Sequence, residues 1–313
     1  MSKPRLLMGL ALPLVLVLAA CGGQDGASSD GISGEVLVDG SSTVAPLAGT
    51  AGELFSAENP DANVSVATSG TGGGFKKFCA GETDIANASR PIKDEERAEC
   101  EANGIAFTEL TVANDALTVV VNNENDWATC LTVDELKKIW APESEGTVTN
   151  WSQVRAGFPE VALDLYGAGT DSGTFDYFTK AINGEEGASR TDYQPTEDDN
   201  VTVTGVTGSK GGLGYFGFSY FEENMDALKA VSIDGGAGCV APSSEAAQNG
   251  TYTPLSRPLF IYVSNAGYTD KPAVKAFVDY FIANDDQITA EALFVPLSEA
   301  QKQAAQEALA AIG

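Results

Sequence analysis

The chain has 313 residues, 43% of them hydrophobic and 20% charged, which are the proportions of a globular protein and exclude a disordered chain. Its formal net charge of −26 argues against nucleic acid and anionic membrane surfaces as partners. The absence of histidine excludes a Ser-His-Asp triad and a phosphatase with a histidine nucleophile. The length allows two ordinary domains or one large domain with ample core.

The N-terminal segment has the pattern of an export signal. A basic start precedes an apolar run from Leu6 to Ala20, which is shorter than the roughly 20 residues that span a membrane. The small residues directly before Cys21 resemble a bacterial lipobox, which makes Cys21 the lipidated first residue. We therefore expect residues 1–20 to be a signal peptide and 21–31 to be a flexible lipidated tether. The protein is then exported and held at the outer face of the cell membrane or in the periplasm, with the lipid anchor as its only membrane contact.

The four remaining cysteines are an even set in an oxidising environment, so the sequence predicts two disulfides. Three pairings are open. We favour Cys79–Cys100 with Cys130–Cys239 because the first two cysteines are close in sequence. A four-thiolate zinc site lacks both a C-x-x-C pair and histidine, so no metal site is expected.

The first predicted strand, Gly34–Asp39, leads into the turn Ser41–Thr43, and apolar residues at helical spacing follow from Val44. The same construction recurs after the predicted strand Asn63–Ala67, where the glycine-rich turn Thr68–Gly74 precedes a second helix. A helix that begins at such a turn presents free backbone N–H groups at the positive end of its dipole, which favours an anion.

The next part of the chain is predicted to contain the stretch Asp84–Ile92, a charged helix over Asp94–Asn103 and a strand over Ile105–Leu110. Ala116–Val121 is an almost continuous apolar run of the kind found in buried parallel strands. Thr132–Glu135 has the pattern of a capping box and predicts the start of another helix.

The construction occurs a third time after the predicted strand Val161–Tyr166. The turn Gly167–Thr174 leads into a helix marked by Phe175, Phe178 and Ile182. An ordinary capped turn is the alternative, because Ser and Thr favour N-caps in any case. The threefold recurrence favours an anion site.

The remaining elements alternate in the same way: an acidic loop over Gly184–Asn200, a glycine-rich segment over Gly205–Gly217, strands over Leu228–Ile233 and Pro258–Val263, and helices over Val274–Ile282 and Ser298–Ile312. Alternating strands and helices predict an α/β fold with mixed, mostly parallel sheets flanked by helices. Ligands of such sheets bind at the carboxyl ends of strands, where all three turns lie. We therefore expect the turns to meet around one oxyanion.

Several motifs together resemble the PstS-type phosphate-binding proteins of the high-affinity phosphate ABC importer. These motifs are Gly40–Leu47, Ser69–Lys76, Ala88–Ile92 and Thr170–Phe175, with Gly214–Gly217 and Ser256–Leu259 in support. Their order and spacing match over essentially the whole mature chain.

The resemblance implies a two-lobed periplasmic binding protein-like (type II) fold with phosphate in the cleft between the lobes. One lobe is expected to comprise 32–114 plus 262–313 and the other 115–261, with chain crossings near Val112–Leu117 and Arg257–Val263. It further implies a monomer that captures inorganic phosphate and delivers it to the membrane subunits of an ABC permease. Catalysis and a cofactor are not expected.

The resemblance assigns phosphate binding to residues of three motifs: Thr43 and Val44, Thr71, and Ser172, Gly173 and Thr174. Our candidate set also includes the neighbouring residues Ser42, Gly72 and Ser89.

Two residues of the better-known relatives do not carry over. Their proton-accepting Asp corresponds to Ser89, and their Arg before Ser-Gly-Thr corresponds to Ala168. We hypothesise that Asp171 supplies the acceptor and Arg90 the guanidinium. The alternatives are a helix cap for Asp171 and an ion pair for Arg90. Arg90→Ala is then expected to weaken phosphate binding at least tenfold.

Three other functions are compatible with the sequence. Sulfate or another tetrahedral oxyanion could be the ligand, since the family acceptor is missing. A secreted phosphatase belongs to a different class, and a phosphatase assay would identify it. A phosphate sensor or surface protein that takes no part in transport would use the same fold.

Overall fold

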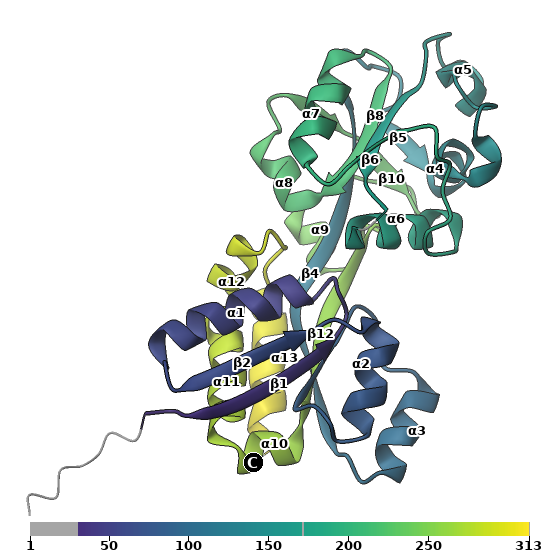
Figure 1. Ribbon diagram of the computed structural model, residues 1–313. Coiled ribbons are helices and arrows are strands. Elements are labelled where there is room, and N and C mark those ends of the chain that lie inside the picture. The colour runs from purple at the N-terminus through teal and green to yellow at the C-terminus, as the bar shows by residue number, and fades with distance from the viewer. Residues whose placement is uncertain (1–30, 171, 313) are drawn as a thin grey trace, which may run out of the picture. The chain divides into compact units, whose positions relative to one another are not determined.

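Figure 1 shows the computed structural model, which describes residues 31–170 and 172–312. Residues 32–313 form one compact unit by their contacts. The expected signal peptide, the lipidation residue Cys21 and the tether up to Asp30 lie outside the described residues. Within the described ranges, the structure has no helix that is long and apolar enough to span a membrane.

Strands and helices alternate along the first part of the chain, and their bounds follow in chain order. They are β1 (Gly34–Gly40), α1 (Ala45–Glu58), β2 (Ala62–Ala67), α2 (Gly70–Cys79), β3 (Ile85–Ala88), α3 (Asp94–Ala102) and β4 (Phe107–Asn122). The middle part contains β5 (Cys130–Thr132), α4 (Val133–Trp140), the 3-10 helix η1 (Pro142–Ser144), α5 (Trp151–Val154), β6 (Asp164–Ala168), α6 (Gly173–Asn183), β7 (Gln194–Thr196), α7 (Asp199–Gly208), β8 (Gly212–Gly217) and α8 (Phe218–Glu223).

The last part of the chain contains short strands, one long strand and the closing helices. They are β9 (Leu228–Ala230), β10 (Ser232–Asp234), β11 (Cys239–Val240), α9 (Ser244–Gln248), β12 (Ser256–Ser264), α10 (Asn265–Asp270), α11 (Pro272–Ala283), α12 (Asp285–Glu291) and α13 (Glu299–Ala310). The predicted helices at the C-terminal end are confirmed, and Ser298 caps α13 with Gln301 in a capping box.

The strand β4 connects two halves of the main sheet, whose order is β2-β1-β3-β12-β4-β8-β6-β7 with β9 also on β4 (Figure 1). Phe107–Ala116 of β4 pairs with β12, and Leu117–Val121 pairs with β8. A separate small sheet has the order β11-β10-β5. Parallel and antiparallel pairs both occur, so the predicted mixed α/β sheet with flanking helices is confirmed.

The prediction of a parallel strand over Ala116–Val121 is wrong, because β4 runs antiparallel to β8, β9 and β12. All residues of this run are buried. Burial on both faces produces a continuous apolar run whichever way the neighbouring strands point, so the pattern does not encode direction.

Each half of the sheet has its own hydrophobic core. The first half packs residues of β1, α1 and α11 together, including Val36, Phe55 and Phe277. The second half packs α4, α6 and β8 around Trp140 and Tyr215. The boundary between two lobes that the sequence predicts stays a prediction, and the partner change of β4 after Ala116 falls inside the expected crossing.

The structure contains the disulfides Cys79–Cys100, between α2 and α3, and Cys130–Cys239, between β5 and β11. These are the pairs that the sequence analysis favours. The first bridge joins two helices next to β3, and the second joins the two outer strands of the small sheet.

Helix α7 lies where the sequence predicts a loop followed by a glycine-rich segment. Its β-branched residues favour a strand by intrinsic propensity, but Thr202 and Val206 are fully buried at helical spacing. Asp198 caps the helix by accepting from the Asn200 amide at 3.0 Å. A side chain at Gly205 would collide with the ring of Tyr166, so glycine permits the close approach of α7 to β6.

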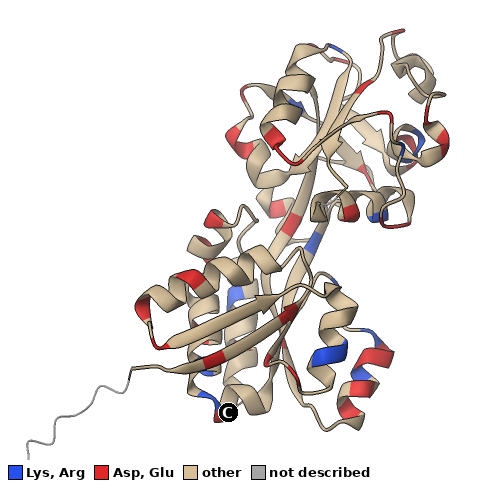
Figure 2. Cartoon of the chain, viewed as in Figure 1, with Lys and Arg blue, Asp and Glu red and all other residues tan. Residues whose placement is uncertain are grey.

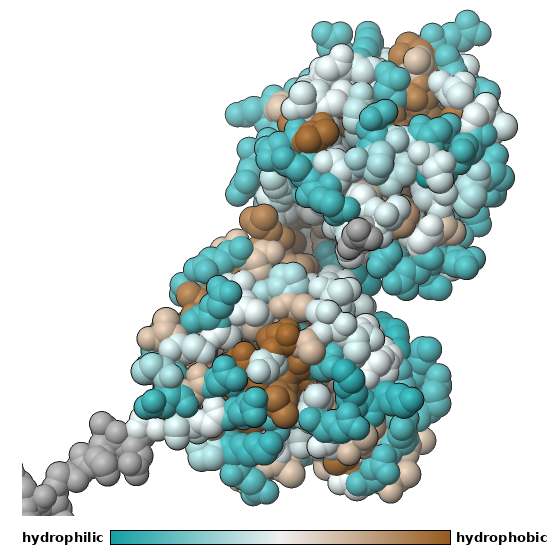
Figure 3. Space-filling view, viewed as in Figure 1, coloured by the Kyte–Doolittle hydropathy of each residue, from teal (hydrophilic) through white to brown (hydrophobic). Residues whose placement is uncertain are grey.

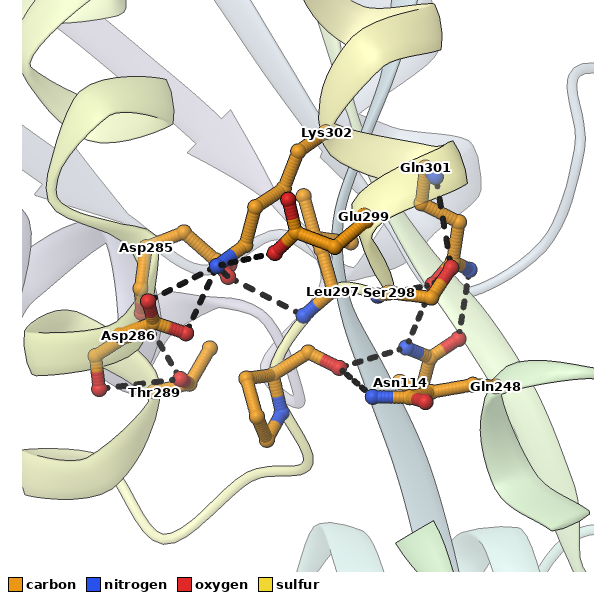
Figure 4. Close-up of polar contacts among 11 residues, drawn as sticks. Asn114, Gln248, Asp285, Asp286, Thr289, Leu297, Ser298, Glu299, Gln301 and Lys302 are labelled. Atoms are coloured by element: carbon orange, nitrogen blue, oxygen red, sulfur yellow. Dashed lines mark hydrogen bonds and ion pairs between the residues drawn. The ribbon is translucent and has the colours of Figure 1, made fainter. Parts of the chain in front are cut away.

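A buried polar cluster fixes the C-terminal helices against β4 (Figure 4). Asn114, only 1% exposed, exchanges hydrogen bonds of 3.2 and 2.9 Å with Gln301. The carbonyl of Pro296 accepts from Asn114 at 3.1 Å and from Gln248 at 3.0 Å. Burial raises the pKa of the nearby Asp285 to about 6, against the opposing effects of the Leu297 amide and Lys302. The cluster connects β4, α9, α12 and α13 in one network.

Acidic residues are distributed over many helices and loops of both halves, and basic residues are fewer (Figure 2). In the face shown by Figure 3, hydrophilic residues predominate and apolar ones occur in separate patches. Large exposed apolar side chains among the described residues are Val201, Met225 and Leu293. The acidity therefore belongs mainly to the solvated surface, and local arrangements decide what the protein binds.

Candidate functional site

A cavity of about 670 Å³ lies where the predicted turns converge, with four cations and two carboxylates in its wall. Its lining comprises Ser41, Ser42, Thr43, Gly70, Thr71, Gly72, Ser89, Arg90, Lys93, Gly173, Asp176, Tyr177, Lys180, Glu186 and Arg257. The lining thus contains seven residues of the candidate set: Ser42, Thr43, Thr71, Gly72, Ser89, Arg90 and Gly173.

The remaining candidate residues are Val44, Ser172, Thr174 and Asp171. Val44 is fully buried at the start of α1, and its amide donates to Ser41 O at 3.2 Å. Ser172 caps α6, and Thr174 lines a smaller neighbouring cavity of about 210 Å³. Asp171 lies outside the described residues.

The turn after β1 is shaped by a glycine that no other residue can replace without strain. Gly40 has φ +145°, and a side chain there would collide with the carbonyl of Asn87 on β3. The Ser41 amide donates to that same carbonyl at 2.9 Å, which fixes the turn against β3. Thr43 is thereby held before the first turn of α1, where helix amides have no partner inside the helix.

The second turn is anchored by Asp39, a carboxylate that is only 3% exposed. Asp39 accepts from the Ser69 amide at 2.9 Å and the Ser69 hydroxyl at 2.8 Å, and it forms an ion pair with Lys77. Burial acts to raise the pKa of Asp39, but the bonds from Lys77 and Ser69 outweigh it and lower the pKa. Gly74 allows the backbone of α2 to lie directly against Gly40. The N-terminus of α2 is therefore fixed at the end of β1.

The second and third motifs are joined by hydroxyl contacts at the cavity wall. Thr71 Oγ1 lies 3.2 Å from Ser89 Oγ and accepts from the Ser89 amide at 3.2 Å. The two hydroxyls therefore face the same space from α2 and from the end of β3.

Arg90 lines the cavity, but its guanidinium is engaged elsewhere. Both terminal nitrogens donate to Glu96, at 2.8 and 2.7 Å, and the group lies 5.6 Å from the ring centre of Phe75. Burial acts to raise the pKa of Glu96, and the bonds from Arg90 and the Lys93 amide lower it by more. The charge of Arg90 is thus largely balanced by one carboxylate.

The third turn places the N-terminus of α6 in contact with the first turn. Ser172 caps α6 by accepting from the Thr174 amide at 3.1 Å. A Cβ atom on Gly173 would lie 3.4 Å from Thr43 Oγ1, so the start of α6 is directly adjacent to Thr43. Two helix N-termini from different halves of the main sheet therefore border one cavity.

The sequence analysis missed Arg257, which lies on β12 directly opposite Asp115 of β4. Its Nε donates to Asp115 Oδ2 at 3.1 Å, and its Nη2 donates to Thr43 Oγ1 at 3.2 Å. The guanidinium carbon is 3.6 Å from the ring centre of Tyr177 on α6. Burial raises the pKa of Asp115, and Arg257 opposes the shift. The Ser256–Leu259 motif was the sequence signal that could have identified this arginine.

The arrangement can bind a tetrahedral oxyanion. It combines helix N-termini, hydroxyl donors and a guanidinium, and these are the donors that suit phosphate or sulfate. Within the described ranges, the structure has no group of three or more side chains suited to hold a metal ion.

Comparison with known proteins agrees with this geometry. The family model of the PBP superfamily domain matches residues 25–285. Protein SphX of Synechocystis sp. is 46% identical over 295 residues, which cover 94% of this chain and 87% of that protein. The phosphate-binding protein PstS of Staphylococcus epidermidis is 37% identical over 298 residues, which cover 94% of this chain and 89% of that protein. The chain belongs to the PstS/SphX family of the PBP superfamily.

A solved structure supports the same assignment for this PstS/SphX family member. The crystal structure of a possible phosphate binding protein from Planctomyces limnophilus matches with a TM-score of 0.84 and 48% sequence identity. The match covers 90% of this chain and 99% of that one. The family consists of solute-binding receptors, which are not a class of enzymes.

Proposed function

We propose that this PstS/SphX family member binds inorganic phosphate in the cavity between the Ser41–Thr43 turn, the start of α2 and the start of α6. The observation that carries the proposal is the position of Arg257. Its guanidinium contacts Thr43 of the first turn and Tyr177 of α6, and it also donates to Asp115 on β4. One cation therefore lies at the point where the two helix N-termini meet.

Arg257 accounts for a departure from the better-known relatives. The arginine that those proteins have before Ser-Gly-Thr is replaced by Ala168 in this chain. A guanidinium that reaches the same cavity from β12 can supply the charge-assisted hydrogen bonds that a phosphate requires. Arg90 remains a second candidate for this role, and it would have to share its bonds with Glu96.

The strong acidity of the chain does not oppose the proposal. Charges beyond about 8 Å are largely screened at physiological salt, whereas the donors of the cavity act at contact distance. The cavity wall itself contains Arg90, Lys93, Lys180 and Arg257 against Asp176 and Glu186. Because Glu96 pairs with Arg90 and Asp115 pairs with Arg257, the directed N–H and O–H donors of the wall favour the anion, and not a surplus of positive charge.

We further propose that the protein delivers phosphate to an ABC permease and is attached to the membrane through a lipid on Cys21. The sequence before Cys21 and the family membership support both parts. Intact mass spectrometry of the exported protein tests the anchor: the wild type should carry the mass of a lipid, and Cys21→Ser should not. An unlipidated wild type that is nevertheless processed and exported would contradict the anchor.

Calorimetric titration with phosphate tests the binding function. The chain from residue 22 onward is suitable, because residues 32–313 form one compact unit with its own hydrophobic cores. After removal of bound anion, we expect one phosphate per chain and much weaker binding of sulfate. Equal binding of both anions would change the ligand class to tetrahedral oxyanions in general. Binding of neither anion would refute the function.

A phosphatase assay on the same sample tests the alternative that the protein is a secreted phosphatase. Turnover of a chromogenic phosphate ester above the level of a Thr43→Val variant would contradict a pure binding role. We expect no difference between the two proteins.

A further inference from the structure

One face of α6 lines the candidate cavity. Gly173, Asp176, Tyr177 and Lys180 follow the i, i+3, i+4, i+7 spacing, and all four belong to the cavity wall. Asp176 lies about 4.5 Å along the axis from Gly173, at roughly 1.5 Å per residue. Helical side chains tilt toward the N-terminus, so the Asp176 carboxyl group leans toward the end of α6 that contacts Thr43.

The Asp176 carboxyl group lies near that of Glu186, and both residues belong to the cavity wall. Burial raises the pKa of Asp176 first, and the negative charge of Glu186 raises it further. Two neighbouring carboxylates repel one another, so an O–H group that donates to one of them is favourable. As an acceptor in the cavity wall, Asp176 therefore suits a ligand that brings its own O–H group.

The cations of the cavity cannot distinguish one oxyanion from another. Arg257, Arg90, Lys93 and Lys180 attract phosphate and sulfate alike, and so do helix N-termini. Discrimination requires an acceptor, because hydrogen phosphate has an O–H to donate and sulfate has none. Among the described residues of the cavity wall, the carboxylates are Asp176 and Glu186.

We infer that Asp176 is the residue that distinguishes phosphate from sulfate, by accepting the O–H of hydrogen phosphate held at the start of α6. This inference rests on the phosphate site proposed above. The O–H of the anion then donates to Asp176 and offsets the repulsion between this carboxylate and the anion. A sulfate oxygen would face the carboxylate with no proton between them, and such a contact between two negative groups is unfavourable.

Ser89, at the position of the family acceptor, cannot take this role. Its hydroxyl can donate to either anion, so it does not exclude sulfate. The hydroxyl also lies 3.2 Å from Thr71 Oγ1, within a contact that joins two motifs. Asp176 reaches the cavity from α6 instead of from β3.

Calorimetric titration with phosphate and with sulfate, each at two pH values, tests the inference on four proteins. They are the wild type, Asp176→Asn, the matched control Glu186→Gln on the same carboxyl pair, and Asp171→Asn, the acceptor suggested by the sequence alone. Asp176→Asn keeps the size of the side chain and can donate to an anion oxygen. We expect it to lower the ratio of phosphate to sulfate affinity at least tenfold, and Glu186→Gln to change the ratio less than threefold.

The outcomes separate this inference from the phosphate site itself. A wild type that prefers phosphate, together with an unchanged ratio in Asp176→Asn, overturns the inference and leaves the proposed function intact. Loss of discrimination in Asp171→Asn alone overturns it in favour of Asp171. A wild type that binds neither anion overturns both. Thermal melting of each variant confirms that the titrated protein is folded.

Discussion

Two arginines line the candidate cavity, and their surroundings differ in a way that indicates their roles. Arg90 directs both terminal nitrogens to Glu96, at 2.8 and 2.7 Å. Arg257 has Asp115 as its carboxylate partner, and its Nη2 also donates to Thr43. The Arg90 pair lies between the end of β3 and α3, within one half of the main sheet, whereas the Arg257 pair joins the neighbouring strands β12 and β4.

The comparison indicates that an arginine within a binding motif is not necessarily the residue that binds the anion. A bidentate pair uses the planar donor set of the guanidinium, and little remains for an anion. A guanidinium held mainly through one carboxylate oxygen retains donors that can bind a second anion. We therefore expect Arg257 to contribute more to phosphate affinity than Arg90, although only Arg90 was predicted from the sequence.

The largest expected effect is that of Arg257→Ala. We expect phosphate affinity to fall about 100-fold, which corresponds to about 2.8 kcal/mol and is the scale of one or two charge-assisted hydrogen bonds. Calorimetry measures this loss. An affinity within threefold of the wild type would show that Arg257 does not bind the anion.

The same variant leaves Asp115 without its partner, so stability must be separated from binding. Breaking a buried ion pair costs on the order of 3–5 kcal/mol, and Arg257→Ala should approach that loss in urea unfolding. The double variant Asp115→Asn with Arg257→Ala should recover much of the stability but none of the affinity. Recovery of affinity in the double variant would mean that the first loss reflected misfolding.

Arg90→Ala should have a smaller effect on affinity. We expect a loss of about tenfold, the minimum set by the sequence reasoning and about 1.4 kcal/mol, because the cavity loses one positive charge that Glu96 already balances. A titration at low and at high salt tests the cause, since a long-range charge effect should shrink at high salt. A loss larger than that of Arg257→Ala would reverse the comparison.

Glu96→Gln is the matched change on the other side of the Arg90 pair. Removal of this carboxylate frees the guanidinium and deletes a negative charge near the cavity, so phosphate affinity should rise about two- to threefold. Titration of this variant beside Asp115→Asn tests whether the two carboxylates differ in role. Asp115→Asn should weaken phosphate binding, because the amide holds Arg257 less firmly.

The smallest expected effects concern the pH dependence of stability. The contributions of Glu96 and Asp115 to stability should change with pH in opposite directions. The pKa of Glu96 in the folded chain is below its ordinary 4.5, so its stabilisation is lost as the pH falls through the folded value. The pKa of Asp115 is above its ordinary 3.8, so its contribution to stability decreases as the pH rises through the folded value.

Urea unfolding between about pH 3 and pH 7 measures both slopes. Glu96→Gln should flatten the loss of stability toward acid pH, and Asp115→Asn should steepen the gain of stability with rising pH. Slopes that change in the same direction in both variants would contradict the assigned shifts.

Local patterns predicted much of this protein. The starts of α1, α4, α6 and α13 follow from turn and capping residues that act within a few positions, as at Thr132 and Ser298. The anion turns could be recognised for the same reason, because glycine, serine and threonine before a helix determine which amides are left unpaired. The family could be identified because several such motifs occur in a fixed order.

Only the tertiary structure could decide which side chains meet. Arg257 and Thr43 are 214 positions apart, and nothing near either residue indicates their contact. The direction of the strand over Ala116–Val121 relative to its neighbours could not be predicted from the sequence either. A strand buried on both faces has the same apolar pattern in either orientation. The sequence therefore determined where helices begin and end and which amides at their starts are left unpaired, because these features depend on residues a few positions apart. The pairing of β4 with β12 decided which charge reaches the cavity, because ion pairing depends on distance in space.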